Sequence, residues 1–261
     1  MHVHFNIFGL NIPAYGLMIT LGVVVANLVA LYFIRKEGRK FDDIILIEAY
    51  CLLGAFVGAK LLYIIVSFND IDWESAKTLE GLSNLMSSGF VFYGGLIGGI
   101  GMILLAGKIH GVESKYYLKN YIFAAPLGHA FGRIGCFCAG CCYGMEYHGP
   151  GAVVFPHGSF APAGVELFPV QLVESACLFI IAGVMIFLKK RGKSAHLIEI
   201  YMIGYGIVRF VLEFLRDDAY RGVYFGISTS QWISMLAVVG GIVLWVINSR
   251  RNTSKEGGLQ S

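Results

Sequence analysis

The segment from His129 to Gly144 combines groups that can do chemistry with a strongly apolar stretch of chain. It holds a histidine, an arginine and four cysteines, Cys136, Cys138, Cys141 and Cys142. An arginine within an apolar membrane helix is costly, so such a residue indicates a functional site by default. Guanidinium groups bind phosphate through two parallel hydrogen bonds. Arg133 is therefore a candidate anion-binding residue.

The composition predicts that this segment lies in a membrane. Of the 261 residues, 56% are hydrophobic and 14% are charged, whereas a soluble domain carries about 25% charged residues. The chain contains seven apolar runs that are each about long enough to span a bilayer as a helix. They cover roughly residues 14–34, 43–67, 89–107, 119–142, 169–188, 195–215 and 229–248.

We therefore expect an all-α, polytopic integral membrane protein with seven transmembrane helices. They should form one membrane domain over residues 1–251, followed by a disordered cytosolic tail over residues 252–261. The first run is too long for a signal-peptide core, so we expect it to be a retained span. The net charge of +3 is small and gives no indication of nucleic-acid binding.

The basic residues predict the orientation, because cytoplasmic loops carry an excess of lysine and arginine. Fourteen of the twenty fall on one side of the seven spans, in the segments 35–40, 108–119, 189–193 and 250–255. The other side holds only Lys77, Arg216 and Arg221, and the loop 145–168 has no lysine or arginine. The N-terminus is thus expected outside and the C-terminus in the cytosol.

Three basic residues, Lys60, Arg133 and Arg209, lie within predicted spans. With this orientation, the polar residues of all seven spans gather toward the outer leaflet. His129 and Arg133 are four residues apart and share a helix face, as do Arg209 and Glu213. Three cations with one nearby carboxylate leave a positive surplus, which favours binding of a phospholipid phosphate. The alternatives are an intrahelical Arg209–Glu213 pair, a Lys60 that snorkels to the interface and a packing role for His129.

The four clustered cysteines allow several interpretations of their role. Their spacing differs from common zinc sites, which pair two cysteines with a second, distant pair, so we expect no metal. A disulfide between Cys138 and Cys141 is compatible with an oxidising outer side. A thiolate activated beside Arg133 is a third reading, and simple packing of small apolar side chains is a fourth.

Six short motifs resemble those of the prolipoprotein diacylglyceryl transferase family, in order along nearly the whole chain. Tyr15-Gly16-Leu17 is similar to the family's opening Tyr-Gly-Leu, and Gly58-Ala59-Lys60 to its Gly-Gly-Arg. The signature Gly-Arg-x-Gly-Asn-Phe-x-x-Gly-Glu-x-x-Gly resembles residues 132–144. The remaining similarities are at Tyr93-Gly94-Gly95, at Pro169-x-Gln171-x-x-Glu174, and at Arg209-x-x-x-Glu213 with Arg216 and Gln231.

The resemblance implies an enzyme of lipoprotein biosynthesis in the bacterial cytoplasmic (inner) membrane. Such a transferase moves the diacylglyceryl group of phosphatidylglycerol to the lipobox cysteine in a prolipoprotein signal peptide and releases glycerol-1-phosphate. It implies no cofactor, and its partners are membrane lipids and the precursor, with no nucleic acid. The catalytic residues it implies are Tyr15, Arg133, Arg209, Glu213 and, on our hypothesis, His129. The substrate-binding residues are Lys60, Tyr93, Gly94, Gly95, Cys136, Cys141, Gly144, Gln171 and Gln231.

The chain departs from the family pattern at groups that handle protons. Tyr93 and Phe168 stand where the family has histidines, Cys136 where it has the signature asparagine, and Cys141 where it has the glutamate. We expect His129 or a cysteine to replace the lost base. The alternatives are a divergent outer-leaflet lipid transferase with another acceptor, or a catalytically inactive phospholipid-binding membrane protein.

Overall fold

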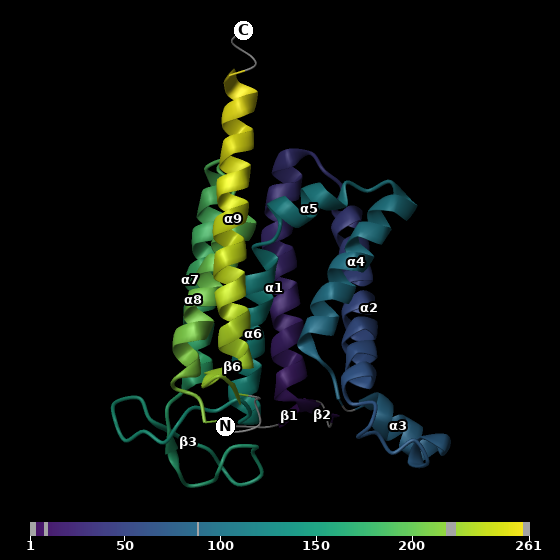
Figure 1. The fold of residues 1–261 in the computed structure, drawn as a ribbon, viewed down its shortest axis with the longest axis vertical. Coiled ribbons are helices and arrows are strands. Elements are labelled where there is room, and N and C mark those ends of the chain that lie inside the picture. Colours follow the sequence, from purple (N-terminus) through teal and green to yellow (C-terminus); the bar gives the residue numbers. More distant parts are fainter. Residues whose placement is uncertain (1–3, 8–9, 88, 218–222, 258–261) are drawn as a thin grey trace. The chain divides into compact units, whose positions relative to one another are not determined.

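The computed structural model describes residues 4–7, 10–87, 89–217 and 223–257 and is mostly helical (Figure 1). Its long helices are α1 (Ala14–Glu37), α2 (Phe41–Val66), α4 (Phe92–His110), α6 (Ala124–Ala139), α7 (Val170–Lys190), α8 (Leu197–Glu213) and α9 (Thr229–Gly257). Shorter helices are η1 (Ser75–Lys77), α3 (Leu79–Ser87) and α5 (Ser114–Asn120). Three antiparallel strand pairs are β1 (His4–Ile7) with β2 (Leu10–Pro13), β3 (Val153–Val154) with β4 (Glu166–Leu167), and β5 (Val223–Tyr224) with β6 (Ile227–Ser228).

The helices confirm a polytopic membrane protein. Each of the seven predicted runs contains one long helix, and five of these in the described chain are long and apolar enough to cross a membrane: α1, α2, α4, α7 and the 229–250 part of α9. The run at 119–142 is instead divided into α5 and α6, which meet at a bend of 59°. Helix α8 has 17 residues, fewer than the roughly 20 that a spanning helix needs. The number of spans and their orientation stay predictions.

Local chemistry explains where α6 begins and ends. Pro126 lies in its first turn, where the missing backbone N–H costs nothing. The helix stops at Gly140, whose φ of 75° places it in the left-handed region. Such a glycine is a common helix terminator, because it lacks the Cβ that this conformation would crowd. The segment after Gly140 therefore leaves the helix axis directly beyond Cys138.

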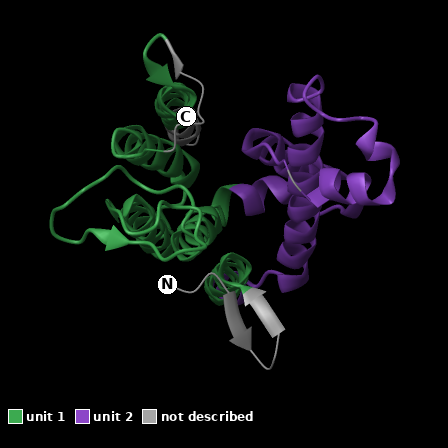
Figure 2. Ribbon diagram, turned by 90° about the horizontal axis from the view of Figure 1, so that it is seen from below, with its two compact units in different colours: residues 1–32, 119–261 green, residues 33–118 purple. Residues whose placement is uncertain are grey.

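The chain forms two compact units, shown in Figure 2. Unit 1 comprises residues 1–32 and 119–261, and unit 2 comprises residues 33–118. The expected single domain over residues 1–251 stays a prediction. Helix α9 runs to Gly257, so residues 252–257 of the expected tail are helical, and residues 258–261 lie outside the described residues.

In unit 1, α6, α7, α8 and α9 pack against one another in sequence order. Helix α1 packs on α6 through glycines: a Cβ at Gly22 would lie 2.8 Å from Phe131, and one at Gly135 would lie 3.0 Å from the Tyr15 ring. Such close approach at small residues is typical of membrane helix pairs. These helices place Tyr15 next to the signature segment.

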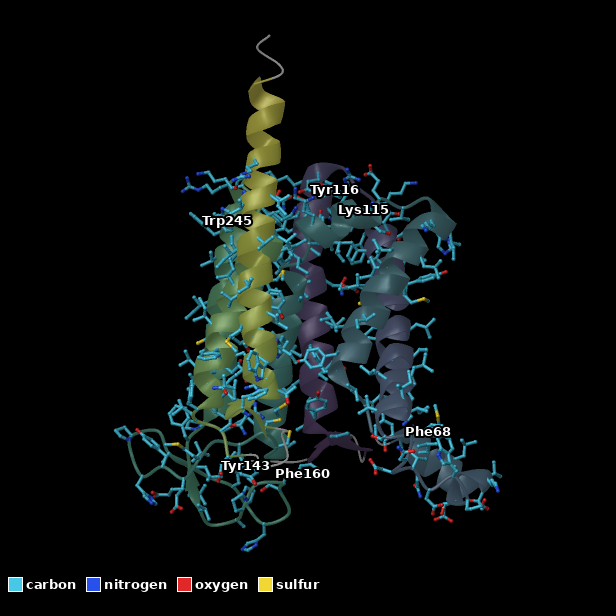
Figure 3. The ribbon with its side chains drawn as sticks, viewed as in Figure 1. Phe68, Lys115, Tyr116, Tyr143, Phe160 and Trp245 are labelled. Carbon is cyan, nitrogen blue, oxygen red and sulfur yellow. The ribbon has the colours of Figure 1, made fainter. Side chains whose placement is uncertain are left out.

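The loop between α6 and α7 has its own small core in unit 1. Phe155, Ala161 and Leu167 are buried, and Phe137 and Tyr143 pack against them. Figure 3 shows Tyr143 and Phe160 at the end of unit 1 opposite to Trp245 on α9. Aromatic side chains at both ends of a helix bundle suit the two membrane interfaces. The loop is thus a folded cover over the end of α6 that carries the cysteines.

Unit 2 is built on a tight α2–α4 contact. The backbones meet at Gly54 against Gly98 and at Gly58 against Gly94, where an added Cβ would lie 2.2–2.4 Å from the facing carbonyl oxygen. Small residues four positions apart on each helix allow this close approach, which is typical of membrane helix pairs.

Gly94→Ala should destabilise the protein by about 1–3 kcal/mol, because the new methyl group would meet the Gly58 carbonyl oxygen and force the helices apart. Gly101→Ala on the same helix is the matched control, since nothing lies within 4 Å of its Cβ position. Thermal unfolding in detergent measures the difference. Equal unfolding temperatures for the two variants would contradict the packing role of Gly94.

Candidate active site

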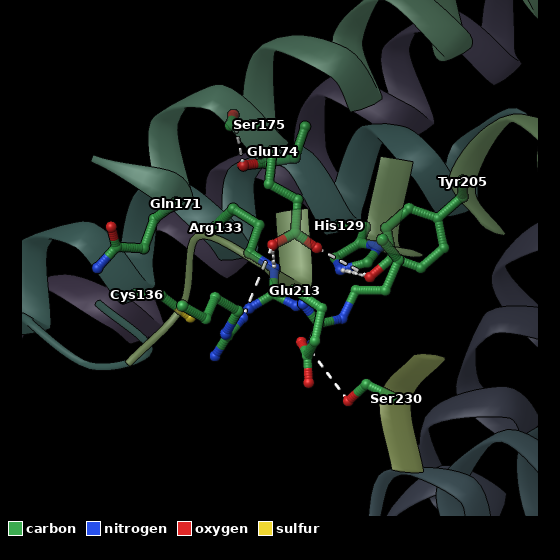
Figure 4. A network of polar contacts seen from close by, with 12 residues as sticks. His129, Arg133, Cys136, Gln171, Glu174, Ser175, Tyr205, Glu213 and Ser230 are labelled. Carbon is green, nitrogen blue, oxygen red and sulfur yellow. Dashed lines mark hydrogen bonds and ion pairs between the residues drawn. The ribbon is translucent and has the colours of Figure 1, made fainter. Parts of the chain in front are cut away.

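A buried carboxylate lies at the centre of unit 1. Glu174 on α7 is fully buried, and its Oε2 lies 3.1 Å from Arg133 Nε and 4.0 Å from Arg216 Nη1. Tyr205 OH donates a hydrogen bond of 2.9 Å to the other carboxylate oxygen (Figure 4). One carboxylate therefore holds two guanidinium groups and a phenol in a fixed arrangement.

A second ion pair lies along α8. Arg209 Nη2 is 2.7 Å from Glu213 Oε2, which confirms the predicted contact four residues apart. The same Arg209 nitrogen donates to Ser230 Oγ at 3.1 Å, and Ser228 Oγ donates to Glu213 Oε1 at 2.7 Å. Gln231 is buried at the start of α9, where its Oε1 accepts from the Ser228 N–H at 3.0 Å. This pair is thus anchored to the first turn of α9.

His129 lies between two tyrosines of α8. Its Nδ1 is 3.4 Å from Tyr201 OH, and its Nε2 is 3.5 Å from Tyr205 OH. The His129 and Tyr205 rings meet edge to face with centroids 4.7 Å apart. Since Tyr205 also reaches Glu174, a chain of polar contacts joins His129 to the Arg133–Glu174 pair.

Three of the four clustered cysteines lie together. The sulfur atoms of Cys136, Cys141 and Cys142 are all within 4.8 Å of one another, and they are free thiols. Gln171, buried in the first turn of α7, donates through Nε2 to the Cys141 carbonyl oxygen at 2.9 Å. The Cys138–Cys141 disulfide, one of the alternatives that the sequence left open, is not present: both cysteines are free thiols.

Gly144 lies where three segments meet. Its backbone bridges that of Arg216, and an added Cβ would lie 2.4 Å from the Phe168 carbonyl oxygen and 3.0 Å from that of Leu215. Met145 N–H then donates to Leu215 O at 2.9 Å. The absence of a side chain at Gly144 therefore allows the end of α8, and with it Arg216, to approach the signature segment.

The four predicted residues of unit 2 form a separate group. Lys60 is buried, and its ammonium donates to the Leu85 and Gly89 carbonyl oxygens. Gly94 and Gly95 lie in the α2–α4 contact, and the Tyr93 ring stacks edge-on against Phe92. The structure thus describes this group by itself, and its place in the same site as Arg133 stays a prediction.

The charge balance differs from the sequence expectation of one carboxylate. Arg133, Arg209 and Arg216 face two carboxylates, Glu174 and Glu213. Periodicity alone could not find Glu174, because its partners lie on other helices. Its place three residues after Gln171 on one helix face was the available signal, whereas nothing in the sequence indicated Tyr201 and Tyr205.

The loop over the site carries a pH-sensitive contact. His148 Nδ1 lies 2.8 Å from Glu166 Oε2, and its Nε2 lies 3.2 Å from Glu146 Oε1. The hydrogen bond to Glu166 raises the pKa of His148 above its ordinary value of 6.5. A raised histidine pKa means that this contact stabilises the loop below pH of about 6.5 and is lost as the pH rises through the folded-state pKa.

We expect the His148 imidazole to titrate above pH of about 6.5 in the folded protein, and Glu166→Gln to lower that midpoint. Glu80→Gln, in the other compact unit, is the control and should leave it unchanged. Histidine NMR signals followed against pH give both midpoints. A His148 midpoint that is the same in the wild type and in Glu166→Gln would refute the contact.

Known proteins resemble this chain over nearly its whole length. The family model for prolipoprotein diacylglyceryl transferase matches residues 2–247. A phosphatidylglycerol–prolipoprotein diacylglyceryl transferase of Clostridium tetani is 37% identical over 95% of this chain and 98% of its own length. Similar enzymes of Clostridium perfringens, covering 97% of each chain, and of Bordetella avium, covering 94% of this chain and 93% of the relative, are 36% and 33% identical. The chain therefore belongs to the prolipoprotein diacylglyceryl transferase family.

Proposed function

We propose that this protein transfers the diacylglyceryl group of phosphatidylglycerol to the lipobox cysteine of prolipoproteins and releases glycerol-1-phosphate. The observation that carries the proposal is the buried cluster formed by α6, α7, α8 and the segment that follows α8, in which three arginines face two carboxylates. A net positive, buried site attracts a phosphate and stabilises the charge that develops as the phosphate leaves. The similar proteins of Clostridium tetani and Clostridium perfringens are named for this activity.

The proposed roles follow from the contacts. Arg133 and Arg209 hold the donor phosphate, while Glu174 and Glu213 orient the two guanidinium groups. Tyr15, next to the signature segment, completes the catalytic set. His129 or a cysteine takes the proton of the acceptor thiol, which must ionise to attack carbon.

The substrate contacts are proposed for the remaining predicted residues. Gln171 and Gln231 are buried in the first turns of α7 and α9, close to the two ion pairs. Lys60 in α2 and Tyr93 at the start of α4, both in unit 2, are proposed to bind substrate. Cys136, Cys141 and Gly144 belong to the signature segment and are proposed to contact the substrate there. Gly94 and Gly95 allow α2 and α4 to approach closely.

We further propose that all seven long helices cross the bacterial cytoplasmic membrane. The N-terminus lies outside and the C-terminus in the cytosol, in line with the excess of basic residues on one side. Helix α8 would then span with residues beyond its ends, and α5 with α6 would form one bent span. The predicted site would face the outer leaflet, where exported precursors arrive.

Purified protein given labelled phosphatidylglycerol and a lipobox peptide tests the function directly. The expected products are a thioether-linked diacylglyceryl peptide and glycerol-1-phosphate, and a peptide with serine in place of the lipobox cysteine is the control. No turnover under conditions where a family member with the asparagine and glutamate signature works would refute the transferase. Binding of phosphatidylglycerol without turnover would instead indicate an inactive lipid-binding protein.

His129→Ala separates the two proposed bases in the same assay. A loss of turnover with unchanged binding of phosphatidylglycerol would support His129. Unchanged transferase activity would refute His129 as the base and leave a cysteine in that role.

A further inference from the structure

The clustered thiols are a feature that the family resemblance does not explain. Cys136 ends the buried face of α6, while Cys141 and Cys142 follow the turn at Gly140. All three sulfur atoms lie within 4.8 Å of one another. The spacing C-x₄-C-C is unlike that of paired zinc motifs, and only the structure shows that the three thiols meet at one point.

The backbone adopts an unfavourable conformation that brings the third sulfur in. Gly140 and Cys142 both have positive φ, of 75° and 58°. This conformation is unfavourable for a residue with a Cβ, such as Cys142, and such strain is concentrated at functional sites. The Cys141 N–H donates to the Cys136 carbonyl oxygen at 3.1 Å, and Gln171 holds the Cys141 carbonyl. These contacts maintain the turn that gathers the sulfurs.

The spacing of the sulfurs fits a thiophilic metal ion. Zinc–sulfur bonds of about 2.3 Å in tetrahedral geometry place bound sulfurs about 3.8 Å apart, within the observed limit of 4.8 Å. Sulfur ligands select zinc-like cations over magnesium or calcium. Three protein ligands with an open fourth position are the pattern of catalytic zinc sites, whereas structural sites have four.

The surrounding charges suit an ion held by thiolates. The positive charges of Arg133 and Arg216 act electrostatically on Cys136 and Cys142. Three thiolates with one divalent cation carry a net negative charge, which the two guanidinium groups offset. Next to the thiols, Gln171 has a buried Oε1 without a hydrogen-bond partner among the residues that the structure describes.

We propose that Cys136, Cys141 and Cys142 bind one zinc-class cation whose open position takes the acceptor thiol. This role rests on the proposed transferase function. With the ion bound, neither His129 nor a cysteine is needed as the base: the acceptor thiol releases its proton to water when its sulfur coordinates the ion, because a coordinated thiol is deprotonated. The new bond joins this sulfur to the diacylglycerol carbon that carries the phosphate, and the bond between that carbon and the phosphate oxygen breaks. The bonding electrons leave with glycerol-1-phosphate, beside Arg133.

Metal binding is tested first, without activity. Full-length protein in detergent, freed of metal under reducing conditions, is given zinc, and bound zinc is measured after gel filtration. We expect one zinc per chain, and cadmium should produce thiolate charge-transfer absorption. Cys136→Ser, Cys141→Ser and Cys142→Ser should each weaken zinc binding by about tenfold or more, since even the loss of a group behind a ligand has such an effect.

The matched control is the double variant Cys138→Ser/Cys177→Ser, whose cysteines lie outside the trio. It should bind zinc like the wild type. Circular dichroism and thermal unfolding identify any variant that fails to fold, and the stoichiometry of the wild type is decisive by itself. No retained zinc, zinc that persists in all three single variants, or a disulfide within the trio of the active protein would each overturn the proposal.

The transfer assay then separates this proposal from the transferase function. A chelator should abolish turnover, and added zinc should restore it. Turnover that is unaffected by the chelator in metal-free protein would overturn the metal site and leave the transferase intact. Stoichiometric zinc on the three cysteines without any thioether product would support the site as a zinc site, while refuting the transferase and the acceptor role that depends on it.

Discussion

Arg133→Gln is expected to lower transferase turnover by about 10²–10³-fold, the effect of removing one preorganised charge donor from a leaving phosphate. The Arg133 side chain is largely buried, and its Nε is held 3.1 Å from Glu174. Its guanidinium is therefore already oriented when the substrate arrives, and a neutral amide cannot replace its charge. Rates of glycerol-1-phosphate release from phosphatidylglycerol measure the loss.

Arg133→Lys sharpens this test. Lysine keeps the charge but lacks the planar fork that binds phosphate through two hydrogen bonds, so its turnover should lie between those of the wild type and Arg133→Gln. Arg191→Gln, at the other end of α7, is the control and should leave turnover unchanged. Wild-type activity in Arg133→Gln would remove Arg133 from the proposed phosphate site.

Glu174→Gln should destabilise the protein by about 3–5 kcal/mol, because it leaves buried guanidinium groups without their carboxylate. Arg133 and Arg216 both lie within 4.0 Å of the same Glu174 oxygen, and Tyr205 donates to the other. Thermal unfolding in detergent or lipid nanodiscs reports the loss of stability. Glu174→Gln protein that does fold should also show a lower kcat, because both arginines lose their fixed orientation.

Glu146→Gln is the matched control, since the Glu146 side chain is exposed in the loop and pairs with the exposed His148. Its stability and turnover should match those of the wild type. If the Glu174→Gln protein were as stable as this control, other groups would have to neutralise the buried arginines. The central role of Glu174 would then be wrong.

The membrane fold could be predicted because it depends on composition and length. A bilayer imposes apolar stretches of about 20 residues on any helix that crosses it, and all seven predicted runs contain a long helix. The bend between α5 and α6 and the short α8 escaped prediction. Hydropathy reports where apolar residues lie and carries no signal for a break in the helix axis.

Contacts within one helix were predictable for a similar reason. The Arg209–Glu213 pair follows from helix periodicity alone, and the structure confirms it. The close approach of Gly58 on α2 to Gly94 on α4, in contrast, joins two helices and is known only from the structure. Glu174 was missed as the centre of the site, because it joins Arg133 on α6 to Arg216 beyond α8, and sequence spacing cannot measure distances between helices.

The sequence by itself determined that this protein is a membrane protein of this transferase family, with arginines inside its apolar helices. Composition indicates the membrane and the order of the motifs indicates the family. The arginines stand out because a charge in lipid is expensive wherever its helix lies. Only the tertiary structure decided which carboxylates neutralise those arginines and that three cysteines meet at one point. Both depend on the turn at Gly140 and on helix packing, which bring together groups whose positions in the chain are unrelated.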